Sequence, residues 1–227
     1  MKQTVTTVFL LLGFLSFSQD WDFEKPNYKE IEKNIQKEGS NLFYNSLMDR
    51  YLKADSTFTL EEKRHLYYGY AFNEKYAPYS HSEYSDSLST ILQKEKLDTI
   101  DLKKVVHFTN ALLHENPFDL NAINYQLYAL DQMEKKEAFD KKIIQFQIVM
   151  DALISSGNGT SKKEAFYVIE TSHEYALLNI LGFQFGGTQS LIEHYDYLTV
   201  AENQAGIDGL YFDVSLCLNS MSEMLKD

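Results

Sequence analysis

The chain has few of the residues that define several common protein classes. It contains one cysteine, so we expect no disulfide framework. Its 21 Lys and Arg residues are outnumbered by 33 Asp and Glu residues, and the formal net charge is -12. Phosphate contacts need a basic face, so we expect no nucleic-acid partner. After residue 18, no apolar run approaches the length that spans a bilayer, and we expect no integral membrane protein.

Apolar and aromatic residues are plentiful by comparison. Hydrophobic residues make up 44% of the chain, and Tyr and Phe number 16 and 15. This composition can bury enough surface to fold, which excludes disorder as the main state.

The first 18 residues have the pattern of a secretory signal peptide. Lys2 precedes a short apolar run at residues 8–15, and Ser16 and Ser18 place small residues before a cleavage site at Gln19. The run is too short for a permanent membrane anchor. We therefore expect an exported protein, periplasmic or extracellular.

Glycine divides the remaining chain into two regions. Residues 19–156 contain only Gly39 and Gly69, whereas residues 157–227 contain seven glycines. Low glycine and proline favour helices, and frequent glycine favours strands and turns. We therefore predict a helical-hairpin region at 19–156 and a small α/β cap at 157–227, packed together as one unit.

The first region shows helical periodicity throughout. Apolar residues from Phe139 to Leu153 recur at spacings of four and three, which is typical of an amphipathic helix. The segment 111–119 resembles the joint between two tetratricopeptide repeats, where a helix ends at Asn116-Pro117. We predict tetratricopeptide-like hairpins, with helices at residues 27–38, 41–54, 59–76 and 83–95, from 101 to 116, from 120 to 130, and from 139 to 153.

The second region alternates as strands do. Apolar positions alternate with others at residues 210–215, where Leu210, Phe212 and Val214 are separated by Tyr211, Asp213 and Ser215, as in a half-buried strand. Residues 165–170 and 195–200 are rich in β-forming residues. Helices are expected at 173–181 and 216–225, with a turn at Gly186-Gly187. The predicted fold class is α+β, with a small antiparallel sheet plus helices in the C-terminal part.

Three stretches carry a resemblance to a secreted bacterial family, the domain of unknown function 4919. They are residues 67–72 with 76–79, residues 168–175 leading to 181–182, and residues 195–200 followed by 210–214. The family has no assigned activity. The resemblance therefore implies location and fold, and it assigns no catalytic residue.

An aromatic stretch provides the candidate binding surface. The helix predicted at 59–76 has two apolar faces, which is typical of a helix packed between neighbours. Tyrosine is also favoured at binding interfaces because it offers rigid amphipathic contact area. We predict a binding surface formed by Tyr68, Tyr76, Tyr79, His81 and Tyr84.

Possible catalytic groups lie in the second region. A general acid–base cluster can form if folding brings His173 and Glu174, or His194 and Asp196, together with the other acids of this region, which are Glu170, Glu193, Asp208 and Asp213. The competing interpretation places these acids on a solvent-exposed face. No known catalytic motif is present, so we predict no catalytic residue, no cofactor and no metal site.

The resulting functional hypothesis is a non-catalytic binding or scaffold protein of the bacterial cell envelope with a protein partner. A hydrolase that uses a carboxylate–histidine cluster in the C-terminal part is the alternative. Calcium binding by the acidic loop around Glu202 and Asp208 is a third hypothesis.

Overall fold

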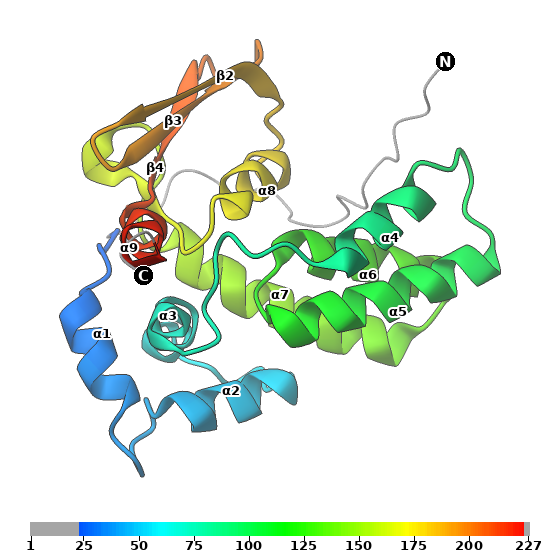
Figure 1. Cartoon of the computed structure of the whole chain (residues 1–227), viewed down its shortest axis with the longest axis horizontal. Coiled ribbons are helices and arrows are strands. Elements are labelled where there is room, and N and C mark those ends of the chain that lie inside the picture. Colours follow the sequence, from blue (N-terminus) through cyan, green and yellow to red (C-terminus); the bar gives the residue numbers. More distant parts are fainter. Residues whose placement is uncertain (1–22, 225–227) are drawn as a thin grey trace. The chain divides into compact units, whose positions relative to one another are not determined.

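Helices dominate the structure, a computed structural model that describes residues 23–224 (Figure 1). The predicted signal peptide, residues 1–18, lies outside the described residues. Nine α-helices and one four-stranded sheet occur in the described part, which confirms the α+β class. The described chain divides into two compact units, one of residues 81–144 and one that joins residues 23–80 to 145–224. The division predicted at residue 157 differs from this one and stays a prediction.

The unit of residues 81–144 is helical. Asp98 and Asp101 form a reciprocal capping box at the start of its longest complete helix, and Asp119 caps the helix that follows. These two helices pack together, and the buried Gln126 amide donates hydrogen bonds to Thr109 Oγ1 (3.2 Å) and Asn110 Oδ1 (2.6 Å). The helices of this unit are α4 (Glu83–Leu92), α5 (Thr99–Glu115), α6 (Leu120–Gln132) and the first part of α7 (Lys136–Ile154).

The second unit contains three short N-terminal helices and the rest of α7. Its most buried helix starts at Thr59, whose side chain and Glu62 form a capping box. Leu66, Tyr67 and Tyr68 on that helix are all fully buried, as expected for a helix with neighbours on two faces. These elements are α1 (Tyr28–Ile35), α2 (Tyr44–Leu52), α3 (Leu60–Gly69), and the 3-10 turn η1 (Tyr70–Phe72).

The sheet of the second unit has the strand order β1-β4-β3-β2 (Figure 1). Burial alternates along β3, so that Asp196, Leu198 and Val200 point to the covered face. The strands are β1 (Phe166–Tyr167), β2 (Phe185–Ile192), β3 (Tyr195–Val200) and β4 (Gly209–Asp213). The turn η2 (Lys162–Glu164) precedes β1, α8 (Ser172–Ile180) lies between β1 and β2 in sequence, and α9 (Ser215–Met224) follows β4.

Two sequence predictions about this sheet are wrong. The sheet is mixed, because β1 pairs with β4 in parallel while the other two pairs are antiparallel. The connection from β1 to β4 runs through α8, β2 and β3, which is long enough for a parallel crossover. Gly186 and Gly187 lie within β2, at an irregularity in its pairing with β3, and do not form a turn. The resemblance to tetratricopeptide hairpins stays a prediction.

Candidate functional site

The five residues predicted to form a binding surface differ in exposure. Tyr68 is fully buried, and its hydroxyl donates to two backbone carbonyls of the core. Tyr76 is half-buried and donates to the Ile169 carbonyl at 2.6 Å, so it also supports the fold. Tyr79 is exposed. These three residues belong to the unit that contains the sheet.

The other two predicted residues belong to residues 81–144. His81 is exposed and lies 3.2 Å from the Asp86 carboxylate. Tyr84 is partly buried against the hydrophobic core of that unit, with its ring 6.4 Å from the ring of Phe108. A single surface containing all five residues stays a prediction, and Tyr79 is the member of the set in the second unit that is open to solvent.

A buried pair of carboxyl groups lies in the second unit. Glu174 is in the first turn of α8, where a negative charge stabilises the helix N-terminus. Its side chain nevertheless turns inward, and the residue is 0% exposed. Asp196 comes from the covered face of β3 and is 6% exposed. We call Glu174 and Asp196 the acidic pair.

Few hydrogen-bond donors serve the acidic pair. No described residue donates a hydrogen bond to either carboxylate oxygen of Glu174. Asp196 accepts one hydrogen bond, from the Gln189 amide at 2.7 Å. Burial, as the main cause, and the neighbouring charge of Asp196 together raise the pKa of Glu174 to about 9. Glu174 therefore holds its proton at neutral pH.

A second set of buried polar groups surrounds His173, at the start of α8. His173 Nδ1 shares a hydrogen bond of 2.8 Å with the Tyr67 hydroxyl, and His173 Nε2 lies 3.8 Å from Glu170 Oε2. Both His173 and Tyr67 are fully buried. The interpretation of the acids as a solvent-exposed face is therefore wrong for Glu170, Glu174, Asp196 and Asp213, which are buried, whereas Glu193 and Asp208 are exposed.

Cys217 on α9 is a further buried group, and Glu174 and Glu170 act on it. The thiol is buried, and desolvation raises its pKa to about 12. The Tyr76 hydroxyl is a hydrogen-bond partner of the thiol, and the charges of Glu174 and Glu170 act on it as well. A thiol in this environment is unreactive as a nucleophile at neutral pH.

Three aromatic side chains around the acidic pair are open to solvent. Tyr79, Tyr175 and Phe185 are 37%, 36% and 40% exposed. The Tyr175 hydroxyl donates to Gln189 Oε1 at 2.5 Å, and its ring meets the Phe185 ring edge-on at 5.3 Å. Burial raises the pKa of Tyr79, and the charges of Cys217, Asp196 and Glu174 raise it in the same direction. We call these three residues the aromatic rim.

Sequence reasoning identified Tyr79 but missed Tyr175 and Phe185. Tyr175 directly follows Glu174, so in a helix whose Glu174 points inward its neighbour can point outward. Phe185 directly precedes the turn predicted at Gly186-Gly187, whereas in the structure it begins β2 and its ring lies against Tyr175 of α8. Neither position is marked by a motif.

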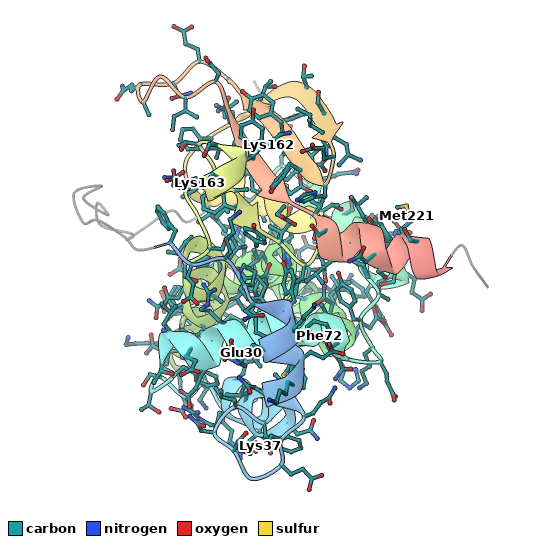
Figure 2. The ribbon with its side chains drawn as sticks, turned by 90° about the vertical axis from the view of Figure 1, so that its left-hand side faces the viewer. Glu30, Lys37, Phe72, Lys162, Lys163 and Met221 are labelled. Atoms are coloured by element: carbon teal, nitrogen blue, oxygen red, sulfur yellow. The ribbon has the colours of Figure 1, made fainter. Side chains whose placement is uncertain are left out.

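No basic residue offsets the acidic pair. Among the ion pairs of the described residues, none involves Glu174 or Asp196. Lys162 and Lys163 extend from η2 (Figure 2), and Lys162 is bound to Glu193 at 2.9 Å. Over residues 23–224, no group of three His, Cys, Asp or Glu side chains is arranged to hold a metal ion.

His194 does not join the cluster around the acidic pair. It lies 3.4 Å from Asp213 and stacks on Tyr195, with about half of its side chain exposed. Its contact with Asp213 is therefore separate from the Glu170–His173 contact.

In the part of the chain that is described, no helix has both the length and the apolar character that a membrane crossing requires.

Comparisons with known proteins place the chain in a family. Neither curated proteins nor solved structures provide a significant match. A family model described as Domain of unknown function (DUF4919) matches residues 29–223. The chain belongs to the DUF4919 family, as the resemblance in its sequence predicted.

Proposed function

We propose that this chain is an exported, non-catalytic binding protein of the bacterial cell envelope, and that the aromatic rim is its binding surface. The observation that carries the proposal is the gathering of three exposed rings, Tyr79, Tyr175 and Phe185, around two buried carboxyl groups. Exposed tyrosine and phenylalanine provide rigid contact area at low cost in conformational entropy. The apolar run and small residues at positions 8–18 support export.

Burial of the polar groups argues against catalysis by the same cluster. A general acid or base must come within hydrogen-bond distance of the substrate. His173 and Cys217, the possible base and nucleophile, are each 0% exposed and are hydrogen-bonded to buried or half-buried tyrosines. The accessible part of the site is the aromatic rim, which suits binding more than proton transfer.

A hydrolase remains the second candidate because of one observation. Glu170 lies beside His173, and Glu174 lies beside Asp196; a protonated carboxyl next to an acidic neighbour is the arrangement of a general acid. A screen of ester, glycoside and peptide substrates against the wild type and Glu174→Gln tests it. Turnover by the wild type that Glu174→Gln abolishes would establish the hydrolase and overturn the non-catalytic proposal.

Site-specific photo-crosslinking in cells tests the binding surface. A photoreactive amino acid at position 79 or 175 should form one dominant adduct with an envelope protein. The matched control is position 52, because Leu52 is 61% exposed in the same unit and lies on α2. The surface assignment fails if the adduct is absent at 79 and 175, or if position 52 gives it equally.

A further inference from the structure

We propose that the partner inserts the ammonium group of a lysine side chain beneath the aromatic rim, where it binds between the carboxyl groups of Glu174 and Asp196. This inference rests on the proposed function for the location of the binding surface. It adds the chemical group that the surface recognises.

The first argument is the unused hydrogen-bonding capacity of the acidic pair. An ionised carboxylate accepts several hydrogen bonds, whereas the residues in the described part offer one donor to Asp196 and none to Glu174. Buried polar groups are nearly always hydrogen-bonded, so a buried carboxyl without a donor points to a missing partner. An ammonium group supplies three donors and can bridge both carboxyl groups.

The second argument is the charge around Glu174. The nearby groups are acidic or neutral, and no lysine or arginine of the described chain forms an ion pair with either member of the pair. A buried carboxylate is stable only when it is paired, so this site favours a cation. The titratable groups that act on Glu174, or share its surroundings, are Glu170 and His173 from its own helix region, Asp196 from β3, Cys217 from α9, and Tyr79 and Tyr175 from the rim.

The third argument separates an organic ammonium from a metal ion. Rings of tyrosine and phenylalanine attract an ammonium through their π faces. Tyr79, Tyr175 and Phe185 provide such rings beside the pair. A hard metal ion instead requires six or more oxygen ligands, and the described residues contain no suitable group of three acidic or histidine side chains.

Binding of an ammonium ion should release the proton that Glu174 carries. Glu174 carries a proton in the free protein at neutral pH. An ammonium ion pairs with the ionised carboxylate, so binding must release that proton, and affinity must rise with pH up to about pH 9. Glu174 itself is buried, so the rim side chains must rotate to admit the ligand, a common change on binding.

Isothermal titration calorimetry with n-butylammonium, the lysine side-chain analogue, tests the inference on the purified protein. The neutral control ligand is 1-butanol. We expect saturable binding of n-butylammonium alone and release of roughly one proton per ligand at pH 7.5, measured from two buffers of different ionisation enthalpy. Glu174→Gln should weaken binding at least tenfold and abolish proton release. The control Glu193→Gln should change neither, since Glu193 is exposed and pairs with Lys162.

Several outcomes would overturn the inference. They are no binding of n-butylammonium, equal binding of 1-butanol, and unchanged binding by folded Glu174→Gln and folded Asp196→Asn. Near-ultraviolet circular dichroism establishes that the variants are folded. Crosslinking at positions 79 and 175 without n-butylammonium binding would overturn this inference and leave the proposed function intact. Binding of n-butylammonium without crosslinking would overturn the protein partner instead.

Discussion

Replacing Glu174 by glutamine should make the protein more stable than the wild type at neutral and alkaline pH. The folded protein holds the Glu174 proton up to a pKa of about 9, whereas an ordinary glutamic acid loses it near 4.5. Between these two values folding takes up a proton, so the free energy of unfolding falls as pH rises. Glutamine has nearly the same shape as the protonated carboxyl and has no proton to lose.

The expected magnitude follows from the width of that pH window. One carboxyl in this state changes the free energy of unfolding by about 1.4 kcal/mol per pH unit. From pH 5.5 to pH 7.5 the wild type should therefore lose roughly 3 kcal/mol relative to Glu174→Gln. Below about pH 4.5 the Glu174 carboxyl is protonated in both the folded and the unfolded protein, so the stability difference between the wild type and Glu174→Gln should no longer change with pH.

Urea unfolding at pH 5.5, 6.5, 7.5 and 8.5 measures the difference directly. Other titrating groups are common to both proteins and cancel in the comparison. Glu193→Gln is the matched control, because the Glu193 carboxylate is solvent-exposed. The stability of this variant should change with pH as that of the wild type does. Parallel stability curves for Glu174→Gln and the wild type from pH 5.5 to 8.5 would show that Glu174 is ionised in the folded protein.

Three further predictions concern the surroundings of the acidic pair. Tyr76→Phe should cost about 1–2 kcal/mol in urea unfolding, because the Ile169 carbonyl loses its 2.6 Å donor; an unchanged midpoint would contradict this role. Gly157→Ala should cost at least about 2 kcal/mol or prevent folding, because its Cβ would lie 2.3 Å from two backbone carbonyl oxygens. Gly206→Ala has open space at its Cβ but a φ of +66°, so in the same assay it should cost only the roughly 1 kcal/mol of a left-handed backbone. Cys217 should resist Ellman's reagent at pH 8 until urea unfolds the protein, and rapid labelling of the native state would contradict its burial.

Local signals in the sequence predicted most of the helices. Thr59 and Asp119 cap helices where their residue types predict, and Asn116-Pro117 ends α5 as expected. The strand predicted at residues 195–200 matches β3 in full, because its aromatic and β-branched residues favour a strand. These features depend on residues close in sequence.

Features that depend on distant residues could not be predicted. Nothing near residue 166 indicates that β1 would pair in parallel with β4, some 45 residues later. The inward direction of Glu174 depends on how α8 is rotated against β3, and a charge in a first helical turn is usually exposed. Tyr68 was placed on a binding surface because it belongs to an aromatic stretch, yet the packing around α3 encloses it.

The protonation state of Glu174 is the property from which the binding site and its ligand are argued. Carbon-13 NMR of the Glu174 side-chain carboxyl, from pH 4 to pH 10 with and without n-butylammonium, measures it directly. We expect a midpoint near pH 9 in the free protein and a lower midpoint when the ammonium is bound. A midpoint near 4.5 in the free protein, unmoved by n-butylammonium, would mean that Glu174 is an ordinary ionised carboxylate and that the acidic pair binds no cation.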